Sequence, residues 1–466
     1  MTLQVPKVEK LMGIEVYATR CPGVGGTIRQ NAEDFVVEEL LVDGSRADAR
    51  SLEERGLKAS KPVLGSSSAR GEYLLCVMAK RNWDTLSVVR KIGLQLGTGP
   101  GMIQTAGIKD AKAVTAQHVT IRGASAEDLR KVRIKDLCLQ PVGYLPTAIS
   151  AFYLLGNSFR IIVRALKDKP DTIERGIAEA VNELNAAGSV PNFFGHQRFG
   201  TVRPITHLVG KAIVKKNLRK AAMLFLSKPS PHEHPASRNA RLTLQATRDF
   251  KQALDEFPRQ LRYERLMLDH LAEKPSDYAG AFRRLPSKLT ELFVQAYQSY
   301  LFNRFLSARI SNGLRLDSLQ DGDFAVGVER SGLPLVKASM TVTPGTLAKM
   351  SDAVKAGKLK LAIPIVGYGQ ASSHGYAGEM EKRILEEESV SPKDFKIKDL
   401  QETSARGGLR TAVTPLNDFW VEQIAQDPTR PNRCQVAMRF MLHRGSYATV
   451  VLREIMKPKN IVNTGF

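Results

Sequence analysis

Cysteine is scarce in this sequence. The four cysteines, Cys21, Cys76, Cys138 and Cys434, lie far apart, and no pair has the CxxC spacing of a structural zinc site. Isolated thiols are typical of a reducing compartment, which predicts a cytoplasmic protein. The run His232-Glu233-His234 lacks the HExxH spacing and lies in a Ser- and Pro-rich segment. We interpret it as a solvated loop and expect no bound metal.

Long hydrophobic runs and cofactor-binding glycine motifs are also missing. No apolar stretch is long enough to span a bilayer, no sustained basic amphipathic helix indicates a membrane surface, and Met1–Gln30 has no signal-peptide core. The glycine-rich run Gly97–Gly101 lacks the Gly-Lys-Ser/Thr ending of a phosphate loop, and so predicts a turn. Without a dinucleotide fingerprint, a cofactor glycine loop or clustered metal carboxylates, a methyltransferase or a nuclease is disfavoured.

Acidic residues are too few to balance the basic ones. The chain has 68 Lys and Arg against 47 Asp and Glu, a formal net charge of +21. A basic balance of this size favours a polyanionic partner, above all a nucleic acid. It carries no information about chemistry, because a basic protein without a catalytic role would show the same balance.

The hydrophobic patterns predict an α+β fold with antiparallel strand pairing. Trp83–Leu96 and Thr172–Ala187 have apolar residues at helical spacing. The predicted strands are Phe152–Leu155, Phe159–Val163 and the alternating run Val436–Leu442, followed by a helix over Ser446–Met456. Residues 43–72 are rich in Ser, Gly, Arg and Lys and predict a long exposed loop. Residues 210–400 are dominated by helix-forming runs. The length of 466 residues allows two or three domains.

One run carries a candidate catalytic acid. In Ala106-Gly-Ile-Lys-Asp-Ala-Lys-Ala-Val-Thr-Ala-Gln117, the carboxylate of Asp110 stands between Lys109 and Lys112, at the end of a short apolar approach. A carboxylate kept ionised by nearby cations can act as a nucleophile or a base. Lys-Asp pairs at strand ends are also common surface features, so this run alone does not decide between catalysis and a structural ion pair.

A second run suggests contact with a nucleobase. Asn192-Phe-Phe-Gly-His-Gln-Arg-Phe-Gly200 combines three phenylalanines with two glycines, two amides and an arginine. Aromatic faces stack on bases, and Asn or Gln side chains can read a base edge. A buried aromatic corner with turn glycines would explain one phenylalanine equally well. The combination with Asn192, Gln197 and Arg198 is harder to explain by packing.

Together the two runs resemble the TruD family of pseudouridine synthases. Four further runs match the family's blocks in the same order, although Ala32 replaces the usual proline of the first. They are Asn31-Ala-Glu-Asp-Phe-Val-Val-Glu38, Leu155-Gly-Asn-Ser-Phe-Arg-Ile-Ile-Val-Arg164, Gln298-Ser-Tyr-Leu-Phe-Asn303 and Gly445-Ser-Tyr-Ala-Thr-Val-Val-Leu-Arg-Glu454. The matches extend from about residue 27 to residue 456, which is nearly the whole chain.

The resemblance implies a domain arrangement that the patterns alone would not suggest. A pseudouridine-synthase-like catalytic domain with a mixed, mainly antiparallel sheet would be interrupted by a largely helical α/β insertion, the TRUD domain. The expected boundaries place residues 1–209 and 401–466 in the catalytic domain and residues 210–400 in the insertion. We expect the chain to act as a monomer.

The resemblance also implies an activity: isomerisation of uridine to pseudouridine in tRNA, typically at position thirteen, without metal or cofactor. Asp110 occupies the place of the family's essential aspartate and would either attack C1′ or abstract the C2′ proton. Phe194 would stack on the extruded base. The implied substrate-binding residues are Arg29, Lys109, Asn192, Phe194, Gln197, Arg198 and Tyr447.

Some alternatives stay open at this point. A buried ring at a helix start explains Tyr447 as well as substrate contact does. Asn192 would either hold its loop or bind near the substrate. We expect Glu38 and Glu454 to be solvated rather than paired with basic residues near the site. A catalytically silent RNA-binding or RNA-folding protein on the same scaffold is the main alternative function, because basic charge and a Phe-rich loop serve binding equally well.

Overall fold

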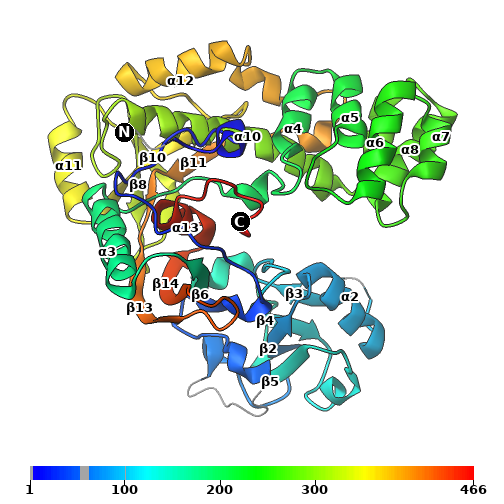
Figure 1. Ribbon diagram of the computed structural model, residues 1–466, viewed down its shortest axis with the longest axis horizontal. Coiled ribbons are helices and arrows are strands. Elements are labelled where there is room, and N and C mark those ends of the chain that lie inside the picture. The colour runs from blue at the N-terminus through cyan, green and yellow to red at the C-terminus, as the bar shows by residue number, and fades with distance from the viewer. Residues whose placement is uncertain (1–3, 53–61, 100) are drawn as a thin grey trace.

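The computed structural model describes residues 4–52, 62–99 and 101–466. Within them the chain has the predicted α+β architecture, with a larger sheet, a smaller sheet and many helices (Figure 1). The larger sheet has eight strands: β1 (Phe35–Leu41), β2 (Tyr73–Arg81), β3 (Ile103–Thr105), β4 (Val114–Arg122), β5 (Leu137–Leu145), β6 (Leu154–Leu166), β13 (Asn417–Gln426) and β14 (Cys434–His443). The other described strands are β7 (Val190–Pro191), β8 (Phe324–Val328), β9 (Pro334–Thr341), β10 (Leu359–Ile365), β11 (Gly408–Thr411) and β12 (Val413–Thr414).

The described α-helices occupy the ends of the chain and most of its middle. They are α1 (Lys7–Leu11), α2 (Thr85–Leu96), α3 (Pro170–Ala186), α4 (Thr206–Val214), α5 (Leu218–Ser227), α6 (Pro235–Thr247), α7 (Phe250–Glu256), α8 (Arg262–Glu273), α9 (Tyr278–Arg283), α10 (Ser287–Ser311), α11 (Leu347–Lys355), α12 (Gly375–Glu387) and α13 (Ala448–Met456). Short 3-10 helices cover Ala32–Asp34, Ala49–Leu52, Val63–Gly65, Asp128–Lys131, Ala151–Tyr153, His196–Arg198, Pro392–Phe395 and Gln401–Thr403.

The larger sheet is mixed and mainly antiparallel, as predicted. Its strand order is β13-β14-β6-β1-β4-β2-β5, and β3 pairs with β4. Of its described pairings, β1 with β4 is parallel and the others are antiparallel. Strands from both ends of the chain therefore complete one sheet. The smaller sheet, β11-β10-β8-β9, includes β11 from beyond residue 400. The domain boundaries at residues 209 and 400 stay predictions.

Local sequence explains the helix that precedes the Asp110 run. The Asp84 side chain accepts hydrogen bonds from the backbone N–H groups of Leu86 and Ser87, which begins α2. Val88 and Ile92 are buried on one face. Gly97 has a left-handed backbone (φ 65°) and ends the helix, so the predicted turn begins there. Pro100, inside that turn, lies outside the described residues.

Three details differ from the sequence prediction. The strands expected over Phe152–Leu155 and Phe159–Val163 are one strand, β6, which begins at Leu154, while Phe152 and Tyr153 lie in a 3-10 helix. Gly156 of β6 lies so close to β14 that a Cβ would come within 2.1 Å of the Leu442 carbonyl oxygen. Strand β14 is buried on both faces rather than half-buried. The segment 43–72 is not wholly exposed: Ala47 and Ala49 pack on the larger sheet. Residues 53–61 of that segment lie outside the described residues.

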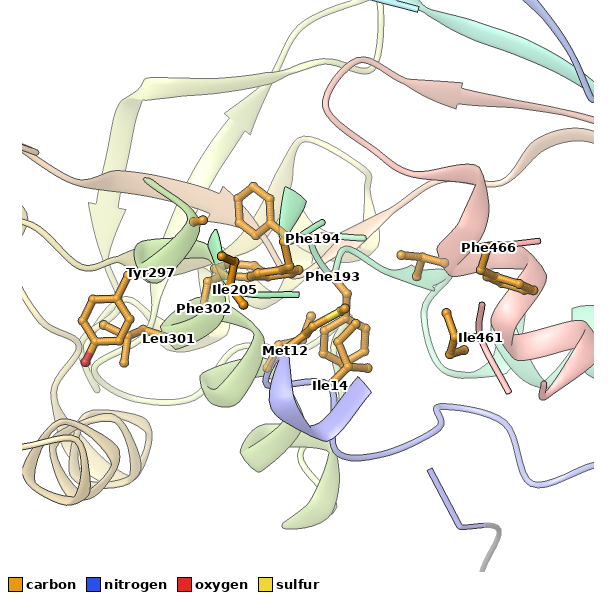
Figure 2. Packing of buried hydrophobic residues seen from close by; sticks show 14 of the residues in the cluster. Met12, Ile14, Phe193, Phe194, Ile205, Tyr297, Leu301, Phe302, Ile461 and Phe466 are labelled. Atoms are coloured by element: carbon orange, nitrogen blue, oxygen red, sulfur yellow. The ribbon is translucent and has the colours of Figure 1, made fainter. Parts of the chain in front are cut away.

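One hydrophobic cluster connects the larger sheet with the segment from α4 to α12, which we call the helical region. Figure 2 shows Met12 and Ile14 of the N-terminal segment, Phe302 of α10, and Ile461 and Phe466 of the C-terminal segment among its members. The 25-residue helix α10 contacts α4, α12 and β10. Because the cluster includes residues of the Phe193–Phe194 segment and of α10 together, the helical region holds that segment directly.

Candidate active site

A cavity of about 420 Å³ lies between the larger sheet and the start of α13. Pockets of this size accommodate a small ligand such as one nucleoside. The cavity is lined by Arg29, Phe35, Val37, Asp84, Ile108, Lys109, Asp110, Ala111, Asn157, Phe159, Gln197, Ser446, Tyr447, Ala448 and Thr449. The structure therefore brings together Asp110 and four predicted binding residues: Arg29, Lys109, Gln197 and Tyr447.

Successive side chains of β1 point to opposite faces of the larger sheet, and only one face borders this cavity. Phe35 and Val37 line the cavity, whereas Val36 and Glu38 line a second hollow of about 680 Å³. Glu38 there pairs with Arg46 and accepts the backbone N–H of Ala49. The smaller cavity is the candidate site because it contains the acid of the Asp110 run.

The carboxylate of Asp110 pairs with an arginine. Asp110 lies on the loop between β3 and β4, and its Oδ1 is 3.2 Å from Arg29 Nη2. The Asp110 side chain is 33 % exposed, and within the described residues its Oδ2 accepts no hydrogen bond. One carboxylate oxygen is thus held by a cation, while the other remains available to a ligand in the cavity.

Several contacts fix Arg29 beside Asp110. Arg29 Nη1 donates to the Gly465 carbonyl at 3.3 Å, and the guanidinium carbon lies 4.0 Å from the centre of the Phe35 ring. The Arg29 backbone has a left-handed conformation (φ 55°), which a residue with a side chain adopts at a cost. The fold therefore maintains a strained backbone at the position that supplies the cation.

The lysines on either side of Asp110 do not pair with it, in contrast to the sequence interpretation. Lys109 Nζ lies 2.8 Å from Glu39 Oε2, and both side chains are buried. Glu39 also accepts the backbone N–H of His118 on β4. Lys112 is exposed. The ion pair between Lys109 and Glu39 forms because β1 and β4 are parallel neighbours, and it anchors the Asp110 loop to the sheet.

Three polar side chains hold the backbone of the Asp110 loop. Lys80 Nζ donates to the Asp110 carbonyl oxygen at 3.1 Å and to that of Trp83 at 2.5 Å. The Thr85 hydroxyl accepts the Lys109 backbone N–H, and the Gln117 side chain donates to the Gly107 carbonyl oxygen. Burial lowers the pKa of Lys80 to about 8, an effect that the negative charge of Asp110 opposes.

Asn192 and Phe194 are placed behind the cavity rather than in it. Asn192 is buried; its side-chain amide donates to the Thr411 carbonyl and hydroxyl oxygens at 3.1 Å and accepts from Arg410. The Phe194 side chain is 8 % exposed. Its ring packs edge-to-face on Phe302, with ring centres 5.4 Å apart, and Figure 2 shows both rings among the buried side chains.

Helix α10 supports the Phe194 backbone directly. The Asn303 side chain accepts the Phe194 N–H at 2.9 Å and donates to the Phe194 carbonyl at 3.1 Å. Arg198 also turns towards α10, where its Nε donates to the Ser299 hydroxyl, and it does not line the cavity. The Gln298–Asn303 run on α10 thus serves to hold the Phe-rich segment.

The remaining side of the cavity comes from the start of α13. Tyr447 is half-buried, precedes the first residue of the helix and has its ring centre 6.3 Å from that of Phe194. Gln197 accepts a hydrogen bond from the Thr449 hydroxyl. Gly195 permits this approach, because a Cβ there would lie 2.9 Å from the Tyr447 ring and the Thr449 hydroxyl. The cavity side of Phe194 is therefore covered by Tyr447.

The sequence interpretation missed several residues of this site. Phe35, Asn157, Phe159, Ser446 and Thr449 line the cavity and belong to the matching runs, which were the available signal. No matching run includes Lys80, Glu39 or Arg410, so the sequence contained no indication of their roles. Glu38 and Glu454, expected to be solvated, are both buried: Glu454 pairs with Arg453 and accepts the Thr19 N–H.

The burial of Phe194 gives a testable prediction. Replacing Phe194 by Ala should lower the free energy of unfolding by about 3–5 kcal/mol, because a packed ring leaves a void. Tyr447→Ala removes a half-buried ring that lines the cavity, and should lower activity more than stability. Urea denaturation and a product assay on both variants separate the effects. A stable but inactive Phe194→Ala protein would instead support base stacking by Phe194.

The described residues show few other functional groupings. In the described ranges, no three His, Cys, Asp or Glu side chains lie together as a metal centre would need. The His232–His234 segment forms a loop before α6, as predicted. None of the helices in the described ranges has the length and apolar character needed to cross a membrane.

Comparisons with known proteins agree with each other. The family model described as tRNA pseudouridine synthase D (TruD) matches residues 11–455. A protein of Methanosarcina mazei named "Probable tRNA pseudouridine synthase D" is 37 % identical over 455 residues, which is 98 % of each chain. A protein of the same name from Methanopyrus kandleri is 38 % identical over 414 residues, covering 88 % of this chain and 92 % of the other.

A solved structure is similar throughout. A crystal structure from Methanosarcina mazei, described as that of the "Putative tRNA pseudouridine synthase D (TruD)", superposes with a TM-score of 0.79 at 37 % identity. The match covers 97 % of this chain and 98 % of that chain. The similarity therefore includes the larger sheet, the Asp110 loop and the helical region alike.

Proposed function

This chain belongs to the TruD family of tRNA pseudouridine synthases, and we propose that it isomerises the uridine at position thirteen of tRNA through the carboxylate of Asp110. The enzyme is an isomerase: the bond between N1 and C1′ breaks, the base turns, and C5 bonds to C1′. The hydrogen of C5 is lost, and N1 gains one, so no oxidant or reductant is required. The observation that carries the role of Asp110 is its partly exposed carboxylate, which lies in the cavity beside Arg29.

The cavity supports two roles for Asp110. Attack by the carboxylate on C1′ would form a covalent sugar intermediate, whereas abstraction of the C2′ proton would make Asp110 a base. Either role needs an available carboxylate oxygen, which Oδ2 supplies. Arg29 neutralises the other oxygen and can stabilise negative charge that develops on the detached base.

The target uridine must leave its stack to reach Asp110. We infer that the extruded base lies against Tyr447, whose ring borders the cavity. Phe194 packs behind this ring, and the Arg410 guanidinium lies over Phe194 in turn. Ile108 lines the same cavity next to Asp110 and is 69 % exposed, so it offers a second apolar contact. Catalysis by a monomer in the cytoplasm, where tRNA resides, completes the proposal.

Mapping pseudouridine in a tRNA transcript tests the proposed position. The purified enzyme is incubated with an unmodified transcript and with a transcript in which cytidine replaces uridine thirteen. We expect pseudouridine at position thirteen of the first transcript, and none in the second. Equal modification of both transcripts would show that the enzyme acts on another uridine.

A further inference from the structure

Helices α5–α9 carry a hollow that is separate from the cavity of Asp110. Helices α5 to α8 lie together in the upper right of Figure 1, away from the strands of the larger sheet, and α9 contacts α5 and α8. The hollow measures about 870 Å³, twice the volume of the catalytic cavity. It is lined by Asn217, Arg219, Lys220, Met223, Leu224, Ser227, Lys228, Gln245, Arg248, Phe250, Pro275 and Tyr278, which we call the α5–α9 groove.

The α5–α9 groove is strongly basic. Arg219, Lys220, Lys228 and Arg248 line it, and no Asp or Glu does so within the described part of the chain. All four side chains are exposed, and none forms an ion pair among the described residues. Partial burial and the positive charge of Arg203 lower the pKa of Lys228. Positive charge is therefore concentrated on the lining of the groove.

The nearest carboxylates in the sequence have other partners. Asp249 accepts the backbone N–H groups of Lys251 and Gln252 at the start of α7. Asp277 contacts His270 and accepts the Gly280 N–H at the start of α9. Both acids serve helix ends, so the four cations of the groove remain available to an external anion.

The backbone at Arg248 is a second, independent observation. Arg248 follows the last residue of α6 in a left-handed conformation (φ 58°). Glycine is favoured at this position because it has no Cβ. Arg248 thus places a cation at the rim of the groove where the backbone would favour glycine.

The floor of the groove is apolar and partly aromatic. Met223 and Leu224 line it beside the half-buried ring of Tyr278, whereas the Phe250 ring is 8 % exposed and packs in the hydrophobic cluster. Cations at the rim and the accessible ring of Tyr278 match an unpaired nucleic-acid strand, whose phosphates face cations and whose bases stack on rings. An acidic peptide would use the cations but would leave the floor without a stacking partner.

We propose that the α5–α9 groove binds an unpaired segment of the tRNA substrate, at a distance from the uridine that reacts. This proposal rests on the proposed function, because it takes tRNA as the ligand. The groove contributes to affinity and leaves the chemical step at Asp110 unchanged. A short RNA that contains the reacting uridine alone does not reach the groove.

Charge reversal tests the proposal. The variant combines Arg219→Glu, Lys220→Glu and Arg248→Glu, and the control reverses the exposed residues Arg238, Arg259 and Arg262, which do not line the groove. Both proteins have the same net charge. We expect the groove variant to bind full-length tRNA at least about tenfold more weakly than the control and to lose about two units of log–log salt slope. Its single-turnover rate at saturating tRNA should match that of the control.

A single substitution covers the case in which the triple variant fails to fold. Arg248→Gly suits the left-handed backbone, so its melting temperature should equal or exceed that of the wild type, while its tRNA affinity should fall about threefold. Equal tRNA affinity of the groove variants and the control would overturn the proposal. If the groove variants bind tRNA more weakly than the control but the wild type forms no pseudouridine, the groove proposal stands and the proposed function is refuted.

Discussion

Replacing Asp110 by Asn should abolish pseudouridine formation while the protein still folds and binds tRNA. The amide preserves the size of the side chain but cannot act as a nucleophile or a base, so we expect the rate to fall by at least about 10⁴-fold. In the ion pair the Asp110 side chain is 33 % exposed and that of Arg29 only 10 %, but the Asn side-chain oxygen can still accept from Arg29, so we expect a loss of stability that leaves the protein folded. Single-turnover assays and equilibrium tRNA binding measure both effects.

A matched control separates catalysis from charge. Asp128→Asn removes an equal charge from the short 3-10 helix Asp128–Lys131, where Asp128 pairs with Lys131 and does not line the cavity. This control should retain wild-type activity. Mass spectrometry of the intact Asp110→Asn protein excludes deamidation back to Asp. Normal turnover by a protein that remains amidated would contradict the catalytic assignment of Asp110.

The second large effect concerns Lys80, the buried lysine beneath the Asp110 loop. Its side chain is fully buried, and its ammonium group contacts two backbone carbonyls but no carboxylate within 4 Å among the described residues. Because its carbonyl contacts fix the loop, Lys80→Met should lower the rate by about 10²-fold through misplacement of Asp110. Lys167→Met, at an exposed lysine, is the control and should leave the rate unchanged.

The stability of the Lys80→Met protein should hardly fall. Burial lowers the pKa of Lys80 from 10.5 to about 8, which means that the charged lysine opposes folding by on the order of 3 kcal/mol. Methionine removes this penalty but leaves two carbonyls without a donor, at a cost of about 1–3 kcal/mol. Net unfolding free energy should therefore change by less than about 2 kcal/mol. A variant that unfolds, or that retains full activity, would assign Lys80 a purely structural role.

The pH dependence of stability checks the same residue. Between pH 8 and pH 10.5 the unfolded chain binds the Lys80 proton more strongly than the folded chain does. The contribution of Lys80 to stability therefore rises with pH in this window. The charged groups near Lys80 are Asp110, Asp84 and Lys109. Urea denaturation gives the free energy of unfolding at each pH. On going from pH 8 to pH 10, this free energy should change more favourably for the wild type than for Lys80→Met.

The sequence was sufficient to predict those residues of the site that lie within the matching runs. The matching runs predicted that Asp110 and Arg29 belong to one site, and the two side chains do pair. The partner of Lys109 was not predictable, because Glu39 reaches it only through the parallel pairing of β1 and β4. No local pattern encodes which strands become neighbours.

The position of Phe194 illustrates the same limit at longer range. Its run looked like a base-stacking loop, and the burial of its ring depends on Phe302 and Asn303, more than 100 residues later in the chain. Whether a ring faces a ligand or a helix is decided by packing between distant segments. Helix periodicity, by contrast, located α2 and α3 to within two residues at each end, because apolar spacing and capping residues act locally.

The most direct test of the central claim follows the hydrogen on C5 of uridine. When C5 bonds to C1′, that hydrogen is lost, so a tRNA transcript labelled with tritium at C5 of uridine releases tritium for each pseudouridine formed. We predict that enzyme in excess over tRNA releases the label of one uridine per tRNA, and that Asp110→Asn releases none while it binds the same tRNA. Tight binding by the wild type without tritium release would contradict the account and would identify the chain as an RNA-binding protein without this activity.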